Sequence, residues 1–599
     1  MKSASARVSQ NPLSLLGHAV RQTLRRGYKL ADFRADLIAG IVTGIVALPL
    51  SMALGIATGV PPEHGLYTAI IAGFIASLTG GAPLQVTGPT AAFVVLLVPI
   101  TSRYGLGGLC LASAMAGAIL LLMALCRLGT LVRYVPHPVT LGFTGGIGVV
   151  IATLQLKDFL GLPVGAMPDT YIEKVQMLYR ALPHLNLADA GVGLGTLALL
   201  LVLPRVAPKV PPALVALGLA GVASFALHQL VPGFSVSTIM DKFSFVENGV
   251  RQAGIPRLPP MPSLSWFAQG LDGQPLIITQ QLLIDLLPSA IAIALLAAIE
   301  SLLAAVVADG MSNRRHNSDA ELLGVGLANL ITPFFGGFAA TGAIARTATN
   351  IRAGARSPFA SMLHAGFVLA SIIAMAPVLG YLPMASLAAL LLQVAWRMSD
   401  APNVLRALKE SPREDVVVLV TCLTLTVVFD MVVSVSVGVL LSALLFSRRM
   451  AAAAEAEQQA NPNNSGVLVH KVHGPLFFGD AERVMEPLYE LDAGTRAVIV
   501  DLQDVTLVDA SGIASLETAV QAVSRNDVPV YLVAPSGQLP RNAIARANLP
   551  QHCDGLTASV SQEAALAELQ SEEDGLSDSF DEGPQVQLAG SLGHSGVAG

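Results

Sequence analysis

Long runs of apolar residues, repeated from residue 36 to residue 447, most limit what this chain can fold into. Of its 599 residues, 53% are hydrophobic and only 13% are charged, and the mean hydropathy is +0.63. A helix needs about 20 apolar residues to cross a bilayer, and helices satisfy their backbone polar groups internally. The sequence therefore predicts a polytopic α-helical membrane protein rather than a soluble enzyme.

The apolar runs divide into fourteen segments, and the charges at the two ends of the series favour an even number of spans. Seven basic residues precede the first segment, and Arg448 and Arg449 follow the last one. Basic residues concentrate on the cytoplasmic side of membrane proteins, so both termini are expected in the cytoplasm. The fourteen segments cover residues 36–60, 65–80, 84–101, 105–127, 136–158, 187–204, 211–230, 279–309, 318–333, 338–354, 358–378, 383–397, 414–429 and 431–447.

The regions outside the spans differ in composition and indicate the domain boundaries. Residues 232–275 are rich in Pro and Gly and are expected to form an external loop, whereas 170–184 has the apolar spacing of an interfacial amphipathic helix. After Arg449 the pattern becomes that of a small soluble α/β domain. The expected parts are a cytoplasmic N-terminal segment (1–32), a transport domain (33–449), a linker that starts as a helix (450–465), the α/β domain (466–570) and an acidic disordered tail (571–599).

Two of the spans are interrupted by glycine at similar places. The third contains "APLQVTGPTAAF" and the tenth contains "GGFAATGAIARTATN"; each begins as a short extended piece, which ends at Gly88 or near Gly342, and continues as a helix. Such pairs are typical of inverted repeats in transporters. A half-helix that begins inside the membrane presents free N–H groups and a positive dipole end, and two such ends form an anion site. The expected ligands are the hydroxyls of Thr87, Thr90, Thr341 and Thr347, the amides of Thr90, Ala91 and Ala345, and the charge of Arg346.

A different interpretation of the same two motifs is open at this point. Runs of Gly and Thr also allow close packing between membrane helices. Arg346 could then extend to the cytoplasmic face beside Arg352 and Arg356. The occurrence of a matching break in both halves of the chain favours the anion site.

Glu300 lies near the middle of the long apolar helix expected over 289–310. Acidic residues at this depth are functional by default. Burial favours the neutral form of a carboxyl group, which suits a proton carrier for anion–proton symport. A sodium ligand and a structural partner of Arg346 are the alternatives. Asp36, Glu63 and Asp309 lie near span ends and are expected to be surface groups.

Four motifs in order resemble the SulP anion transporters, which carry a C-terminal STAS domain. They are "VTGPTAAF", "AAIESLLAAVVADGM", "NLITPFFGGFAATGAIARTATNIRAGARSP" and "LVDASG". The sequence looks closest to the DauA-type C4-dicarboxylate transporters of bacteria. The resemblance implies a UraA-like fold of seven plus seven inverted spans with core and gate domains, a homodimer in the bacterial inner membrane, and a cytoplasmic STAS domain. It also places substrate at Gly88, Pro89, Thr90, Ala91, Ala345, Arg346 and Thr347, and matches Glu300 to the family's acidic position.

Two departures from the family pattern bear on the coupling ion. Leu50 follows Pro49 where many members have Glu or Gln, and Ala304 stands where sodium-coupled members have a hydroxyl. Both argue for protons over sodium. The predicted function is a proton-coupled secondary transporter of small organic anions, with C4-dicarboxylates such as succinate, fumarate and aspartate as substrates. The alternatives are a sulfate or bicarbonate transporter and, less favoured, a passive anion channel.

Two residues of the α/β domain, Asp509 and Ser511, sit where a strand turns into a helix. Ser511 could be a helix N-cap. By resemblance to anti-sigma-factor antagonists it could instead be phosphorylated, and the domain could contact a second copy or a cytoplasmic protein. The four scattered cysteines form no metal-binding pattern, and no nucleotide-binding loop or nucleic-acid-binding feature appears, so no cofactor is expected.

Overall fold

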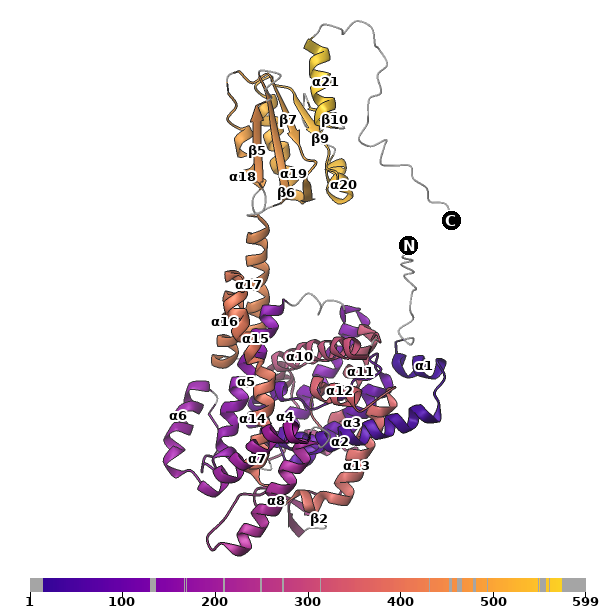
Figure 1. Ribbon diagram of the computed structural model, residues 1–599, viewed down its shortest axis with the longest axis vertical. Helices are drawn as coiled ribbons and strands as arrows, with labels where there is room; N and C mark the ends of the chain where they lie inside the picture. The colour runs from indigo at the N-terminus through magenta and orange to yellow at the C-terminus, as the bar shows by residue number, and fades with distance from the viewer. Residues whose placement is uncertain are drawn as a thin grey trace. The chain divides into compact units, whose positions relative to one another are not determined.

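The computed structural model places the chain in two compact units, Met1–Leu440 and Leu441–Gly599. It describes residues 15–129, 136–165, 167–168, 170–207, 211–247, 250–271, 274–312, 314–429, 431–451, 455–460, 466–477, 481–492, 494–547, 549, 556–559 and 561–573. Most of the predicted acidic tail, the first fourteen residues and part of the predicted linker lie outside these ranges. Each unit is described by itself (Figure 1).

The first unit is a bundle of helices, and each of the fourteen predicted apolar segments corresponds to helical structure in it. Among the described residues, seven helices are long and apolar enough to cross a membrane. The third and fourth segments lie in one of these, α4, which is broken at Gly105, where φ is 66°. The seven are α2 (Leu30–Ala57), α4 (Ala91–Leu125), α5 (His137–Phe159), α7 (Leu187–Val206), α8 (Pro212–Leu230), α10 (Gln280–Ser312) and α13 (Phe359–Leu379). The other segments form α3 (Pro62–Thr79), α11 (Ser318–Ile331), α12 (Ile344–Arg352), α14 (Met384–Ser399), α16 (Arg413–Val428) and α17 (Met431–Ala451).

The two halves of this bundle pack against each other in a reciprocal way. In the first half, α2 and α3 contact α13 of the second half; in the second half, α10 and α11 contact α4 of the first. The first two helices of each half thus pack against the equivalent later helix of the other half. This is the packing expected of an inverted repeat, and it brings the two broken segments to the centre of the bundle.

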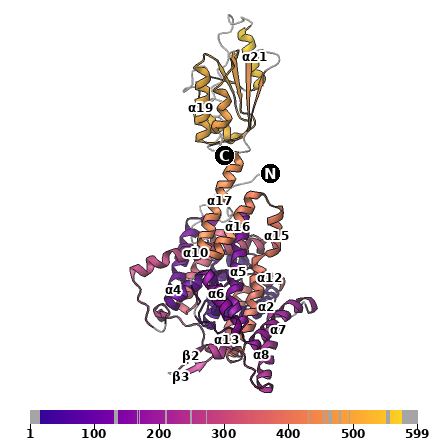
Figure 2. The ribbon, with the colours of Figure 1, turned by 90° about the vertical axis from the view of Figure 1, so that its left-hand side faces the viewer.

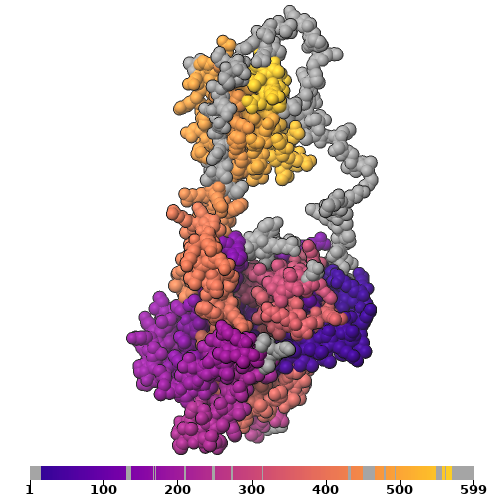
Figure 3. Space-filling model, viewed as in Figure 1, coloured from indigo at the N-terminus to yellow at the C-terminus, as the bar shows by residue number. Residues whose placement is uncertain are grey.

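The helices of the first unit separate into two groups. One group, the core, contains α2, α3, α4, α10, α11, α12 and α13, which contact one another. The other, the gate, contains α5, α7, α14 and α16, where α14 packs on both α5 and α7. In the space-filling view the purple surface of α5–α8 lies opposite the indigo surface of α1–α3 (Figure 3). This division agrees with the core and gate expected from the family resemblance.

The connections between spans carry short elements. The predicted interfacial helix is α6 (Tyr171–Ala181), followed by the 3-10 turn η3 (Leu182–His184). The predicted external loop contains α9 (Ile239–Lys242), the hairpin β2–β3 (Ser244–Glu247 and Val250–Ala253) and η4 (Leu264–Ala268). Other short elements are α1 (His18–Arg25), η6 (Thr332–Phe335) and α15 (Ala401–Glu410).

The second unit contains a six-stranded sheet with helices on both faces. The strand order is β10-β9-β7-β6-β5, with β8 also paired to β6, and all pairs are parallel except β5 with β6. One face is covered by α18, α19 and α20, and the other by α21, and Figure 2 shows α19 and α21 on opposite sides of the sheet. The strands are β5 (Glu455–Ala460), β6 (Val467–Leu476), β7 (Ala497–Asp501), β8 (Val505–Val508), β9 (Val530–Val533) and β10 (Leu556–Ser559). The helices are α18 (Ala481–Met485), α19 (Ala510–Ser524), α20 (Gln538–Ala547) and α21 (Gln562–Glu573).

One element of this unit differs from the sequence-based expectation. Residues 455–460, predicted as part of a linker that starts as a helix, form β5, which pairs antiparallel with β6. Alanine and glutamate favour a helix when isolated, but backbone pairing with a neighbouring strand overrides a weak local preference. The sheet thus begins before the predicted domain boundary.

Candidate functional site

The two broken segments meet directly at the centre of the core. Thr87–Gly88 forms β1 and Thr341–Gly342 forms β4, and the two pair antiparallel, with Thr87 opposite Gly342 and Gly88 opposite Thr341. From β1 the chain continues through Pro89 into α4, and from β4 it continues into α12. Two half-helices therefore begin beside one two-residue ladder inside the bundle, as the paired glycine breaks predict.

Neither half-helix is capped by a side chain at its N-terminus. Thr90 is the N-cap of α4 but its hydroxyl makes no cap hydrogen bond, and Ala343, the N-cap of α12, has no hydroxyl to offer. The first N–H groups of a helix have no intrahelical acceptor, and together they carry a partial positive charge. The first turns of α4 and α12 thus provide amide donors that can bind an anion.

Arg346 lies in the first turn of α12 and is only 2% exposed. Its Nη2 atom donates to the carbonyl oxygen of Pro89. Within the described residues, its Nε and Nη1 atoms have no hydrogen-bond partner and the guanidinium forms no ion pair. The side chain does not extend to a surface beside Arg352 and Arg356, so this part of the alternative interpretation does not fit the structure.

Gly88 makes room for this guanidinium. A Cβ atom at Gly88 would lie 2.5 Å from Nη1 of Arg346, closer than real Cβ contacts come. The absence of a side chain at Gly88 therefore lets the positive charge of α12 lie against the strand that leads into α4. Both halves of the chain contribute to the same positive region.

Glu300, on α10, faces the start of α4. Its Oε2 atom accepts a hydrogen bond of 3.0 Å from the hydroxyl of Thr90. No ion pair between Glu300 and Arg346 is present among the described residues, so Glu300 is not the structural partner of that arginine. The neighbouring Leu296 and Ile299 line a small apolar hollow with Leu96 of α4. The carboxyl group is thus half-buried, beside both a half-helix N-terminus and an apolar surface.

Two of the predicted hydroxyl ligands, those of Thr341 and Thr347, are used by the scaffold. Thr341 donates to the carbonyl of Ala297 at 3.1 Å and lies 2.8 Å from the hydroxyl of Ser301. The hydroxyl of Thr347 accepts from the backbone N–H of Val86 at 3.0 Å. Both threonines are fully buried, and they join β4 to α10 and α12 to the strand β1. Their hydroxyls position the site and are not turned toward a ligand.

The remaining predicted residues surround the ladder at different depths. Thr87, Gly88, Pro89 and Ala91 are buried, Thr90 is half-buried and Ala345 is exposed. The open side of the arrangement is therefore formed by Thr90 at the start of α4, by Glu300 of α10 and by Ala345 at the start of α12. An anion that reaches the two N-termini would approach from this side.

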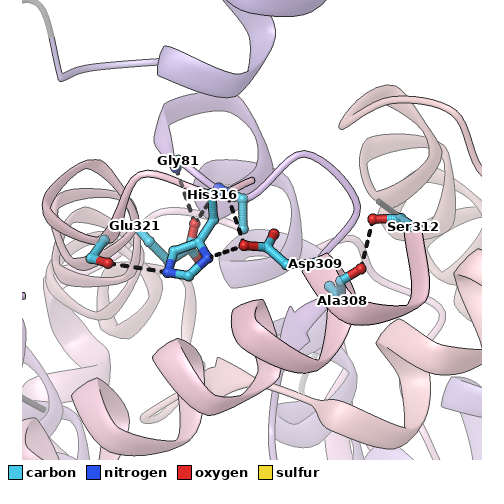
Figure 4. A network of polar contacts seen from close by, with 8 residues as sticks. Gly81, Ala308, Asp309, Ser312, His316 and Glu321 are labelled. Carbon is cyan, nitrogen blue, oxygen red and sulfur yellow. Dashed lines mark hydrogen bonds and ion pairs between the residues drawn. The ribbon is translucent and has the colours of Figure 1, made fainter. Parts of the chain in front are cut away.

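The sequence analysis missed a second buried carboxylate, Glu321 on α11. It is 2% exposed and accepts from the backbone N–H groups of Gly81 and Ala82, at 3.0 and 2.8 Å, and from Nε2 of Gln85 at 2.9 Å. These three donors fix the segment that leads into β1, and Figure 4 labels Gly81 and Glu321. The sequence does show an acidic residue within the apolar run 318–333. Because it lies at the end of a predicted span, it is easily taken for a surface group.

Three acidic residues expected at the surface are engaged in the structure. Asp36 is fully buried and accepts from the hydroxyl of Tyr28 at 2.8 Å and the backbone N–H of Arg356 at 2.6 Å. Glu63 is 8% exposed. Asp309 accepts from the backbone N–H of His316 at 3.1 Å and lies 2.8 Å from its Nδ1 atom (Figure 4). A distant part of the chain covers Asp36, which a local pattern does not reveal, whereas the partner of Asp309 lies only seven residues further along the chain.

In the second unit, Asp509 rather than Ser511 is the N-cap of α19. Oδ1 of Asp509 accepts from the backbone N–H of Gly512 at 2.8 Å. Ser511 lies within the first turn and is exposed. The N-cap interpretation of Ser511 is therefore wrong, because the aspartate two residues earlier already satisfies the helix start.

Comparison with known proteins agrees with this fold. The model of the Sulfate permease family matches residues 33–421, and that of the STAS domain matches residues 458–561. The chain therefore belongs to the sulfate permease family, whose members are also called SulP transporters, and carries a C-terminal STAS domain. The broken helices and the multi-pass bundle are those of a membrane anion transporter.

Several relatives carry transport functions in their names. The chain is 37% identical to "Putative sulfate transporter YvdB" of Bacillus subtilis, over 88% of this chain and 95% of that protein. It is 29% identical to the bicarbonate transporter BicA of a Picosynechococcus species, over 81% of this chain and 85% of that one. Among solved structures, SLC26A9 matches with a TM-score of 0.79 at 18% identity, over 95% and 94% of the two chains. The transmembrane domain of a cyanobacterial BicA matches with a TM-score of 0.57 at 26% identity, over 69% of this chain and 98% of that one.

Proposed function

We propose that this protein is a proton-coupled secondary transporter of small organic anions that works by alternating access. Succinate, fumarate and aspartate, which are C4-dicarboxylates, are the proposed substrates, as in the DauA-type members that the sequence resembles. The substrate would bind between the first turns of α4 and α12 and cross as the core moves relative to the gate. The observation that carries the proposal is the pair of uncapped half-helix N-termini at the β1–β4 ladder.

The donors at this site suit a carboxylate. The amides of Ala91 and Ala345 belong to opposite first turns, and Arg346 adds a full charge behind them. Hydrogen bonds to ionised groups are about twice as strong as neutral ones, so such a site would bind an anion without a metal ion. The small side chains of Ala91 and Ala345 leave more room than an inorganic anion requires.

Glu300 is the proposed proton carrier. Its carboxyl group touches Thr90 at the start of α4, so its charge state acts directly on the positive end of that half-helix. An ionised Glu300 would compete with the substrate for this positive region, whereas a protonated Glu300 would not. Binding of an anion and of a proton would thereby be coupled. Ala304, which lacks a hydroxyl, argues against a sodium ion at this place.

A sulfate or bicarbonate transporter is the second candidate. The observation that favours it is the names of several relatives, which are sulfate and bicarbonate transporters. Both anions would use the same half-helix N-termini. A passive channel is less favoured, because the arrangement provides one central site flanked by apolar helices instead of a continuous polar pore.

The proposal includes the location and the assembly of the protein. We place it in the bacterial inner membrane as a homodimer, with both termini in the cytoplasm, where the STAS domain could contact a regulatory protein. Exposed Ser511 would be accessible to a kinase in this arrangement.

Uptake into proteoliposomes tests the function directly. Labelled succinate, sulfate and bicarbonate would each be supplied with an inward proton gradient, an inward sodium gradient or neither. We expect succinate to accumulate with the proton gradient alone. Accumulation of sulfate or bicarbonate but not succinate would select the second candidate, and uptake that never exceeds equilibrium would support a channel.

A further inference from the structure

The first short helix, α1, and the connection between α10 and α11 meet at one end of the core. The backbone N–H groups of Gly17 and Ala19 donate to the carbonyls of Thr79 and Gly80, at 2.7 and 3.2 Å. The N–H of Asn317 donates to the carbonyl of Gly81 at 3.3 Å. Two segments that are about 300 residues apart in the chain thus form hydrogen bonds with the same few residues at the end of α3.

Basic side chains from both segments gather at this junction. Arg25 and Arg26, at the end of α1, are exposed, and Arg314, in the α10–α11 connection, is half-buried. Burial and the nearby Arg26 guanidinium lower the pKa of Arg314, and burial with Arg21 and Arg25 lowers that of His18. Burial is the largest cause of each pKa shift and the neighbouring guanidinium groups add to it, whereas Asp36 and Asp32 act in the opposite direction on Arg314.

The nearby acids do not form ion pairs with these arginines. Asp32 pairs with Arg356 at 2.9 Å, and Asp36 accepts from Tyr28 and Arg356 instead. In the described residues, no ion pair is present for Arg25, Arg26 or Arg314. The guanidinium groups are therefore left to bind an anion from outside the protein.

Apolar side chains lie next to this basic cluster. Leu24 of α1 and Leu30 at the start of α2 are 56% and 68% exposed. The opposite face of α1 packs against the bundle, where Ala19 and Thr23 are buried. A short helix with arginines and exposed leucines, which precedes a membrane span, is typical of a segment that lies in the headgroup region of a bilayer.

We propose that Arg25, Arg26 and Arg314 form a binding site for the headgroup of an anionic phospholipid. The phosphodiester would lie between the guanidinium groups, and the acyl chains would run along Leu24 and Leu30 into the bilayer. Clusters of basic residues next to a span and basic pockets between spans both recognise such lipids. A lipid headgroup suits the site better than free phosphate, because the apolar side chains need a partner as well.

The site is close in the chain to the candidate anion site. Ala19 of α1 and Asn317 donate to the carbonyls of Gly80 and Gly81. These two glycines begin the segment that leads to β1 and that is held by Glu321. A bound lipid would thus join α1 to the α10–α11 connection at the base of the first half-helix. Binding of the lipid does not depend on which anion is transported.

Lipid retention by the full-length protein tests this proposal. The purified protein would be titrated with phosphatidylglycerol or phosphatidylcholine in detergent, and bound lipid would be counted by native mass spectrometry. We expect the wild-type protein to retain phosphatidylglycerol preferentially. In Arg26→Gln/Arg314→Gln, its affinity should fall by about fivefold for each guanidinium removed.

Two further variants control for fold and for general charge. Arg26→Lys/Arg314→Lys keeps the charges and should retain most of the affinity. Arg397→Gln/Arg406→Gln removes two exposed arginines from α14 and α15, on the gate, and should bind phosphatidylglycerol like the wild type. Equal retention of the two lipids by the wild type, or an equal loss in the two glutamine variants, would overturn the proposal. These outcomes do not depend on transport and cannot be confused with a failure of the proposed function.

Discussion

Arg346 carries a full positive charge in the bundle interior, but most of its polar atoms have no hydrogen-bond partner among the described residues. It is 2% exposed, donates from one nitrogen to the carbonyl of Pro89, and has two unpartnered nitrogens among the described residues. A buried donor without a partner costs about 1–3 kcal/mol, and more when it is charged. In the proposed function, an anion bound at the first turns of α4 and α12 would offset this cost.

Replacement of Arg346 by alanine should therefore weaken binding of the transported anion. Because hydrogen bonds to charged groups contribute about 1.5–3 kcal/mol, we expect a loss of roughly 10- to 100-fold in affinity. Isothermal titration of the purified protein would measure it. Arg352→Ala, which removes an exposed arginine from the other end of α12, is the matched control and should bind normally. An affinity within about twofold of the wild type for Arg346→Ala would contradict the proposed role of this residue.

Glu300 can be tested by a change that keeps its shape. Glutamine in place of Glu300 can still accept from Thr90 but cannot take up and release a proton. We expect Glu300→Gln to bind the substrate but to lose accumulation driven by a proton gradient, measured as uptake with and without the gradient. Glu410→Gln, an exposed substitution on α15, should retain coupling. Unchanged proton-driven uptake by Glu300→Gln would rule out the carrier role.

At the scale of elements, the two half-helices approach one another because glycine occupies both strands of the ladder. At Gly342 a Cβ atom would lie 2.1 Å from Nε2 of Gln85, and at Gly88 it would lie 2.5 Å from Nη1 of Arg346. A strand of two residues has too few hydrogen bonds to resist displacement. The close approach of the Arg346 and Gln85 side chains to the ladder thus depends on the absence of side chains at these two residues.

Gly88→Ala should move the guanidinium of Arg346 away from β1 and weaken anion binding, although Arg346 itself is unchanged. Overpacking of a buried site typically costs about 1–3 kcal/mol, so we also expect a lower melting temperature. Gly366→Ala on α13 is the control: its Cβ would meet no atom within 4 Å, and alanine in a helix is favoured over glycine. Normal affinity in purified Gly88→Ala would mean that the close approach of Gly88 and Arg346 is not needed for binding.

The half-helices could be predicted from the sequence because local signals mark them. The roles of the buried threonines and of Glu321 could not, because they depend on contacts with distant residues. Gly88 and Gly342 interrupt apolar runs within a few residues, and this is visible along the chain. The hydroxyls of Thr341 and Thr347 were expected to face a ligand, but their partners lie 40 and 261 residues away. The burial of Glu321 likewise depends on Gly81 and Gln85, about 240 residues earlier. A pattern of residue types can place a half-helix, but it cannot tell which polar group another segment will satisfy.

At the scale of the whole molecule, each of the two units has a core of its own. The buried cluster of the second unit is formed by residues between Val467 and Leu569, with one part on each face of its sheet. Nothing in these clusters comes from the membrane spans. We therefore expect the sheet and its helices, produced alone from residue 455 at the start of β5, to fold and to unfold cooperatively in water.

A buried histidine makes the stability of this second unit depend on pH. His470 of β6 is fully buried, its Nε2 atom lies 3.0 Å from the carbonyl of Val484, and its Nδ1 atom has no partner among the described residues. Burial lowers the pKa of His470 below its usual value near 6.5. The folded state thus binds the proton less readily than the unfolded state, and stability is fully present above about pH 6.5 and falls as the pH decreases below it.

The contribution of His470 to the slope below that pH is at most about 1.4 kcal/mol per pH unit, which corresponds to one proton taken up on unfolding. Urea denaturation of the isolated unit, followed by circular dichroism between about pH 5 and 8, would measure it. His470→Gln removes the titrating group and should flatten the curve in this range, whereas His473→Gln, a partly exposed residue near Asp504, should leave most of the slope. A wild-type unit equally stable across this range would show that His470 does not remain neutral in the folded state. Through His470, acidification would weaken the STAS unit alone, because this histidine lies in a core that the spans do not share.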